Sequence, residues 1–412
     1  MTVTAPGAPA VAPAAAKPAL PPRPVQPLHI PARMPALTLE LTLRREQRGE
    51  VMFDAASRAR YATDASIYQV EPVGVVVPQD EADLRIIMDV ARGLSVPILA
   101  RGAGTSQCGQ TVGQALIVDC SKYLRKIIDF DHARAEVTVQ PGIVLDDLNA
   151  YLRAHGLWFP VDVSTSAQCT LGGMAGNNSC GSRSIRYGNM VHNVVAIDAI
   201  LADGTEAAFG PLDGNEGATA RRLGDAVAAL AAREKERIER YVPKVLRRVG
   251  GYNIDIFHPQ SERPYTTDNS VNMAHLLVGS EGTLAMTKRL TLKLAPLPAH
   301  RVLGVVNFAS FRQAMESAQH IVRLNPVTVE LVDRTMIELA RANPAFRPVI
   351  EGALSGAPEA ILLVEFTGDT AAAPLRDLKR LGELMGDLGL QGSVVEIVDP
   401  RRQAALWEVR KA

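Results

Sequence analysis

Closely spaced cysteines are missing from the sequence, and with them the usual ligand sets of zinc and iron–sulphur centres. The four cysteines, Cys108, Cys120, Cys169 and Cys180, include no CxxC pair. Structural zinc sites and iron–sulphur clusters are built on such pairs, so we expect no metal centre within these 412 residues. We interpret the four cysteines as free thiols of a protein from a reducing compartment.

Clustered histidines are missing as well. No HxH or HxxxH spacing occurs, so each histidine is expected to be a surface residue or a hydrogen-bonded core residue rather than a metal ligand. The histidines considered are His132, His155, His192, His258, His275 and His320.

The sequence has neither an excess of charge nor a long apolar run. Its 44 basic and 44 acidic residues cancel, which gives no reason to expect a nucleic acid or an anionic membrane as partner. No apolar run reaches the roughly 18 residues of a membrane span, so we predict a protein without one. These features indicate a cytoplasmic protein, with peripheral attachment to the inner membrane as the alternative.

Composition divides the chain into several parts. Proline and alanine dominate residues 1–36, a composition typical of a disordered arm rather than a signal peptide. We expect a helical lead-in over residues 37–69, a first domain over 70–298 and a partial second domain over 299–412. Residues 211–275 interrupt the first domain with a charge-rich helical insertion, whose basic side chains indicate a solvated face or an interdomain contact.

Alternating apolar runs and turn signals predict an α+β fold. Residues 74–78 and 96–100 are strand-like, and Asp80 begins a helix between them, as in a βαβ unit. A hairpin is expected over residues 193–209 and a strand followed by a turn over 276–283. Beyond residue 300, strands and helices alternate, which indicates a second α+β domain with a ferredoxin-like layer.

The loop RGAGTSQ at residues 101–107 follows a predicted strand. Two glycines two apart, followed by two hydroxyl residues, can turn several backbone N–H groups inward and form an anion-binding nest. A dinucleotide-binding GxGxxG turn is the obvious rival, but Gln107 stands where its third glycine belongs. A strand-like run also follows where that motif requires a helix. A pyrophosphate nest and a tight surface turn therefore remain as the two interpretations.

Residues 160–188 form the stretch around which the chain is organised. They show no helical or alternating period, and glycines are interleaved with Ser, Thr and Asn. Such residues allow close backbone approach and offer short hydrogen-bonding groups, so we predict a loop that surrounds a large polar ligand.

Three motifs in one order resemble a known family: RGAGTSQ at 101–107, TLGGMAGNNSCG at 170–181 and VGSEGTLA at 278–285. They resemble the FAD-binding domain of the vanillyl-alcohol oxidase/p-cresol methylhydroxylase (PCMH-type) family, over about residues 70–298. Within it the chain is most similar to the FAD-linked D-2-hydroxyacid dehydrogenases, and to their large bacterial iron–sulphur type. The resemblance implies two α+β subdomains that hold FAD, followed by an α+β cap domain.

The resemblance also implies site residues. The pyrophosphate is expected to contact Arg101, Gly102, Ala103, Gly104, Thr105, Ser106 and Gln107. The ribityl chain and the flavin are expected to contact Pro160, Thr170, Gly172, Gly173, Asn177 and Gly181. The opposite side of the flavin is expected to contact Glu281, Gly282 and Thr283. Arg410, in LWEVR, is expected to bind the substrate carboxylate, with a solvent-facing helix arginine as the alternative. FAD is expected to bind without a covalent link, since that branch generally lacks one.

The implied reaction is the oxidation of a D-2-hydroxy acid such as D-lactate, D-2-hydroxyglutarate or glycolate, with a quinone or an electron-transfer protein as acceptor. The HxGDGNxH-type stretch that supplies the family's metal ligands and base is not present. We therefore expect an N-terminal portion of a longer dehydrogenase, with the base, the divalent metal and any iron–sulphur cluster beyond residue 412. Such a portion is expected to bind FAD but to turn over little or no substrate by itself. Two alternatives are another flavoenzyme of the same fold and a non-catalytic FAD-binding electron-relay module.

Overall fold

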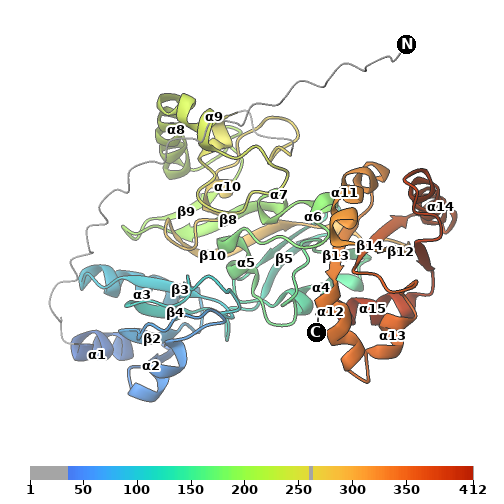
Figure 1. Cartoon of the computed structure of the whole chain (residues 1–412). Helices are drawn as coiled ribbons and strands as arrows, with labels where there is room; N and C mark the ends of the chain where they lie inside the picture. The colour runs from blue at the N-terminus through green and yellow to red at the C-terminus, as the bar shows by residue number, and fades with distance from the viewer. Residues whose placement is uncertain (1–35, 259–262, 412) are drawn as a thin grey trace, which may run out of the picture. The chain divides into compact units, whose positions relative to one another are not determined.

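The first sheet is formed by a strand of the lead-in and by the strands before and after the predicted pyrophosphate loop (Figure 1). The computed structural model describes residues 36–258 and 263–411, so all but the last residue of the predicted arm lies outside the described residues. The sheet has the order β1-β2-β4-β3 and consists of β1 (Glu50–Met52), β2 (Gly74–Val77), β4 (Leu116–Asp119) and β3 (Ile98–Arg101). Strands β2 and β3 both run parallel to β4, which lies between them.

Helix α3 (Glu81–Gly93) connects β2 to β3 and confirms the predicted βαβ pattern. The Asp80 side chain accepts hydrogen bonds from the N–H groups of Ala82 and Asp83, as a helix cap does. Leu84 and Ile87 are fully buried in the core beneath the sheet. The lead-in holds α1 (Ala36–Glu46) and α2 (Ala55–Tyr61), but it also holds β1, which the helical prediction missed because its pairing with β2 is a tertiary contact.

A second sheet, of order β5-β6-β10-β8-β9, forms the other half of the first domain. The hairpin predicted over residues 193–209 is present as β8/β9, a second hairpin is formed by β5/β6, and β10 joins the two antiparallel through β6 and β8. The bounds are β5 (Ile127–Asp131), β6 (Glu136–Val139), β10 (Met286–Lys293), β8 (Val194–Ile200) and β9 (Glu206–Phe209), with helix α4 (Leu145–Arg153) and the two-stranded pair β7 (Leu157–Trp158) and β11 (Ala295–Pro296) beside them.

The glycine-rich stretch is not the loop that its sequence predicts. It contains two short helices, α5 (Leu171–Asn177) and α6 (Ser184–Tyr187), and a third, α7 (Met190–Asn193), follows directly after it. Thr170 caps α5 by accepting a hydrogen bond from the Gly173 N–H at 3.3 Å, and Leu171 and Met174 are buried in the main core. Tertiary burial thus offsets the poor helix propensity of its glycines.

The predicted strand over residues 276–283 is also wrong. The segment begins in a short helix, α10 (Ala274–Leu277), and continues as turns. Side chains hold it there: the Asn272 amide oxygen accepts from the Ala274 N–H, and Asn253 donates to the carbonyls of His275 and Val278. The charge-rich insertion before it contains α8 (Ala218–Arg233), α9 (Lys235–Tyr241) and the 3-10 turn Ile254–Phe257.

The second domain has the predicted ferredoxin-like layer. Its antiparallel sheet has the order β13-β14-β12-β15, which places the first and third strands in the centre. The strands are β12 (His300–Phe308), β13 (Thr328–Asp333), β14 (Ala360–Gly368) and β15 (Val394–Ile397); the helices are α11 (Phe311–Ile321), which ends in a 3-10 turn (Val322–Leu324), α12 (Arg334–Ala342), α13 (Arg347–Glu351), α14 (Ala372–Asp387) and α15 (Pro400–Lys411). No helix in the described part of the chain is long and apolar enough to cross a bilayer.

Two histidines in the first domain, the buried His275 and the partly buried His192, should make its stability depend on pH. The rings of His192 and His275 both lie 5.8 Å from the Tyr265 ring, and burial lowers the pKa of each imidazole to about 4. The unfolded chain binds these protons near pH 6.5, whereas the native chain binds them only near pH 4, so the unfolded state carries more protons between those values.

We therefore expect the free energy of unfolding to fall as the pH drops from 6.5 to 4, by on the order of 3 kcal/mol for each histidine. Denaturant titrations at half-unit pH intervals measure this slope. A His192→Asn, His275→Asn variant should show a flatter profile over the same window, and an unchanged slope would contradict the assignment.

Candidate functional site

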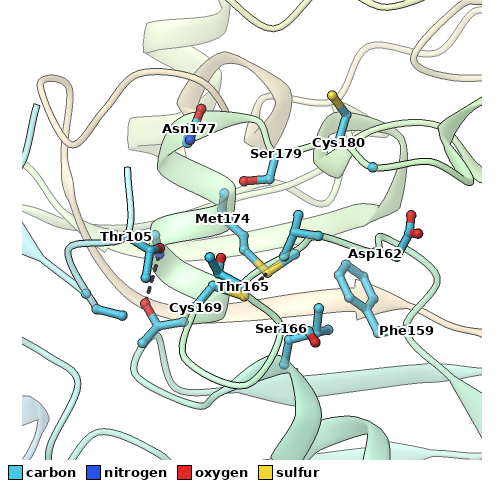
Figure 2. A pocket seen from close by; sticks show the side chains of 18 of the residues that line it. Thr105, Phe159, Asp162, Thr165, Ser166, Cys169, Met174, Asn177, Ser179 and Cys180 are labelled. Atoms are coloured by element: carbon cyan, nitrogen blue, oxygen red, sulfur yellow. Dashed lines mark hydrogen bonds between the residues drawn. The ribbon is translucent and has the colours of Figure 1, made fainter. Parts of the chain in front are cut away.

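A cavity of about 940 Å³ opens where the three motifs of the first domain meet the second domain. Small-molecule sites commonly occupy about 300–1,000 Å³, so this one suits a large ligand. Figure 2 shows Thr105 from the loop after β3 on one side of the space and Asn177, Ser179 and Cys180 from the glycine-rich stretch on another. All of residues 101–107 line it, as do Thr170, Gly172, Gly173, Asn177, Gly181, Glu281 and Gly282.

Residues 102–107 form the loop in which the sequence predicts an anion-binding nest. Within the described residues, none of the N–H groups of this loop donates a hydrogen bond. Gly104 has a φ of +67°, a conformation that L side chains rarely adopt, and the loop borders the cavity. Unpaired backbone donors are costly unless water or a ligand accepts from them, so this loop suits a multiply charged anion.

Arg101 lines the same cavity, but its guanidinium is used by the protein. It donates to the carbonyl oxygens of Tyr61, Thr63 and Thr111 at 3.2, 2.8 and 3.3 Å and lies 5.2 Å from the centre of the Tyr61 ring. In this structure the Arg101 guanidinium therefore holds the start of the loop against neighbouring carbonyl groups. The donors left for an anion are the backbone N–H groups of the loop.

The glycines of α5 have different surroundings. A Cβ on Gly172 would lie 2.5 Å from the Pro141 side chain, and one on Gly181 would lie 1.6 Å from the Asp162 carbonyl oxygen. Gly173 is exposed, and a Cβ there would approach only the Thr170 hydroxyl, at 3.2 Å. Gly172 and Gly181 are thus required by packing, whereas Gly173 leaves room for a ligand.

The third motif lies against the carboxyl end of α5. The Glu281 N–H donates to the Gly176 carbonyl at 3.0 Å, and both Glu281 and Gly282 have positive φ. Burial raises the pKa of the Glu281 carboxyl, although a hydrogen bond from Gln110 opposes the shift. Pro160 and Thr283 do not line the cavity; the Thr283 hydroxyl is occupied by Tyr252 and the Ser280 carbonyl.

On the side of the second domain, the cavity contains a cluster that sequence reasoning missed. Arg183 donates to both oxygens of Glu365 at 3.2 and 3.3 Å and to Asp162 at 3.5 Å. Its guanidinium lies 5.7 Å from each of the rings of Trp158 and Trp407. Burial lowers the pKa of Arg183, but the facing carboxylates outweigh that effect and raise it overall. Arg183 and Glu365 are 182 positions apart, so no local pattern could have paired them.

Arg410 lies in the cavity lining, near the end of α15. Its Nε donates to Glu330 Oε1 at 2.7 Å, and Nη2 contacts the same oxygen. The arginine expected to bind substrate thus already has a carboxylate partner. That partner is Glu330 of β13.

Comparisons with known proteins agree with this arrangement. The family model described as "FAD binding domain" matches residues 72–210, and the model "FAD linked oxidases, C-terminal domain" matches residues 297–412. Among solved structures, an alkyldihydroxyacetonephosphate synthase aligns with a TM-score of 0.64 over 92% of this chain and 63% of that chain, at 16% identity, which shows a shared fold.

Curated relatives include two D-2-hydroxyglutarate dehydrogenases. The Haemophilus influenzae protein is 30% identical over 82% of this chain and 34% of its own length; the Escherichia coli (strain K12) protein is 32% identical over 79% and 32%. The Bacillus subtilis glycolate oxidase subunit GlcD is 25% identical over 87% of this chain and 64% of its own length. The chain spans about a third of the length of the two dehydrogenases. With both family models matched in succession over well over half of its residues, the chain belongs to the FAD-linked oxidase family.

Proposed function

We propose that the chain binds one FAD in the cavity and that the FAD-bound protein oxidises a D-2-hydroxy acid to the 2-oxo acid. The observation that carries the proposal is the run of N–H groups at residues 102–107, which have no acceptor in the described part of the chain and border a cavity large enough for a dinucleotide. When bound, FAD would supply a hydride acceptor, which no amino-acid side chain provides. The relatives named for D-2-hydroxyglutarate and glycolate support the substrate class.

The residues of this chain divide the task. The N–H groups of residues 102–107 would bind the pyrophosphate, and Thr170, Gly173 and Asn177 would line the remainder of the nucleotide. The second domain would cover the cavity and exclude water. Among the residues that the structure describes, no three His, Cys, Asp or Glu side chains are grouped as metal ligands. The proposal therefore assigns neither a metal ion, nor an iron–sulphur cluster, nor the general base to these residues.

The FAD is proposed to bind without a covalent link. Cys169 lines the cavity, but burial raises the pKa of its thiol to about 11, so it is not a thiolate near neutral pH. We expect precipitation of the FAD-loaded protein with acid to release all the flavin into the supernatant. Yellow colour retained in the washed pellet would contradict this prediction.

Anaerobic titration tests the activity. D-Lactate or D-2-hydroxyglutarate should bleach the flavin absorbance of FAD-loaded protein that also contains the general base, whereas the L-enantiomers should leave it unchanged. Residues 1–412 alone, to which no general base is assigned, should bind FAD but be bleached slowly or not at all. Protein that binds FAD and contains the base but is bleached by no D-2-hydroxy acid would leave the FAD-binding part of the proposal standing and overturn the proposed activity.

A further inference from the structure

The solvent-exposed residues that line the cavity fall into two groups. One group consists of residues of the three motifs together with Cys108 and Val249, and within the described part of the chain its one charged side chain is Glu281. The other group comes from α4, the loop after β7 and the second domain, and it comprises Asp146, Arg153, Ser164, Arg301, Ala404 and Glu408. The cavity therefore meets solvent at two places that differ in their charged residues.

Part of the second group borders a strip of cavity wall that crosses from the first domain to the second. Helix α4 ends at Arg153, and just beyond it the carbonyl of Gly156 accepts a hydrogen bond from the Leu297 N–H at 2.9 Å. Leu297 and Pro298 line the cavity, and Arg301 follows them near the start of β12. We call this strip, residues 153–156 and 297–301, the seam; an exposed arginine lies at each end of it.

The two arginines of the seam are uncommitted. Within residues 36–258 and 263–411, neither guanidinium has a hydrogen-bond or ion-pair partner. The other arginines of the cavity wall, Arg101, Arg183 and Arg410, all have such partners. Arg410 nevertheless keeps N–H donors for a ligand, because Glu330 occupies only part of its guanidinium. Arg410 thus remains the arginine expected to hold the substrate carboxylate.

Acidic residues offset the two free charges of the seam only in part. Asp146 lies about two helical turns before Arg153 on α4. Glu408 already has an interaction partner within the chain. The carboxylates of Asp162 and Glu365 both face Arg183. The seam therefore carries an excess of uncommitted positive charge, which the exposed residues of the motifs do not.

We propose that the seam is the entrance for the anionic substrate, where Arg153 and Arg301 attract the 2-hydroxy acid before its carboxylate reaches Arg410. This inference rests on the proposed function for the identity of the anion. Charged residues at the mouth of a cleft raise the local concentration and the association rate of a ligand of opposite sign, and salt weakens the effect. The two arginines would thus set how readily an anion enters, not how it is held.

The chain contains its own reporters for this entrance. Its two tryptophans, Trp158 and Trp407, both line the cavity, and Trp158 is paired with Ala295 beside the seam. Iodide, an anion, and acrylamide, a neutral molecule, both quench tryptophan fluorescence by collision. The ratio of their quenching constants therefore measures how strongly the cavity favours anions. The chain is titrated with each quencher, with and without bound FAD, at low and at high salt.

The test variants are Arg153→Gln, Arg301→Gln and the double variant. At low salt the double variant should lower the iodide quenching constant about two- to threefold, and each single variant should lower it less. Acrylamide quenching should not change, and at high salt the iodide constants of the double variant and the unmodified chain should converge. Because both arginines are exposed and bond to no other side chain among the described residues, the variants should fold normally.

Two further variants are matched controls. Arg312→Gln removes an exposed arginine of α11, outside the cavity lining, and should leave the iodide constant unchanged. Asp146→Asn removes the opposing charge on α4 and should raise that constant at low salt.

The inference is overturned if the double variant keeps the iodide quenching of the unmodified chain, if acrylamide quenching falls equally, or if the difference persists at high salt. Titration with FAD separates these outcomes from failure of the proposed function. If the chain binds FAD but the arginines do not affect iodide quenching, the entrance is wrong and the proposed function stands. If the iodide result is as expected but the chain binds no FAD, the entrance for anions stands and the proposed function fails.

Discussion

Replacement of Arg183 by methionine is expected to lower the free energy of unfolding by about 3–5 kcal/mol, the usual cost of removing one partner of a buried ion pair. The cost is large because Glu365 would remain with 2% of its side chain exposed and no cation to face. Methionine fills much of the space between Trp158 and Trp407, so the change removes charge more than volume. Denaturant unfolding followed by tryptophan fluorescence measures the loss.

Two further variants separate the charge from the packing. Arg183→Met combined with Glu365→Leu removes both charges, and it should recover most of the lost stability because replacing a buried pair by apolar residues is often nearly neutral. Arg312→Met removes an arginine whose partner, Glu316, is also exposed, and it should produce no measurable change. A single Arg183→Met variant as stable as the unmodified chain would show that the cluster does not hold the two domains together.

Replacement of Gly173 by valine is expected to abolish FAD binding while leaving the fold intact. FAD at 100 times its dissociation constant should stabilise the unmodified chain by about 2.7 kcal/mol, and the variant should show none of this gain. A valine at Gly173 would project into the cavity, where a Cβ meets only the Thr170 hydroxyl. Valine is no worse than glycine in a helix, so α5 itself should survive.

Gly382→Val is the matched control, because Gly382 also lies within a helix, α14, and a Cβ there meets nothing within 4 Å. It should retain the full stabilisation by FAD. Gly172→Val is a poorer test: its Cβ would overlap Pro141, so lost binding could follow from lost packing. If Gly173→Val were stabilised by FAD as much as the unmodified chain, the glycine-rich stretch would not border the nucleotide.

Local sequence patterns were sufficient to predict much of the fold. The helix after Asp80 was predictable because a capping carboxylate and a 3.6-residue apolar period occur together. The second domain was predictable because its strands and helices alternate with clear breaks, and the sheet order is the one a ferredoxin-like layer requires. The glycine spacing after a strand is likewise a local signal, and it directed attention to residues 102–107, where anion binding stays a prediction.

Features that depend on tertiary contacts were not predictable. Helix α5 contains three glycines and is stable because Leu171 and Met174 are buried against residues far away in sequence. The direction of the Arg101 side chain depends on the carbonyls of Tyr61 and Thr63, which lie 40 and 38 positions earlier, between β1 and β2. The partner of Arg410, 80 positions away on β13, had no sequence signal either.

The central claim is that the backbone of residues 102–107 and the segments facing it hold FAD. Titration of the chain, stripped of bound flavin, with FAD tests it most directly, with flavin absorbance and the fluorescence of Trp158 and Trp407 followed together. We expect saturation at one FAD per chain, quenching of both tryptophans and a shifted flavin band, with all three absent in Gly173→Val. A chain whose fluorescence and thermal stability do not change with added FAD would contradict the account.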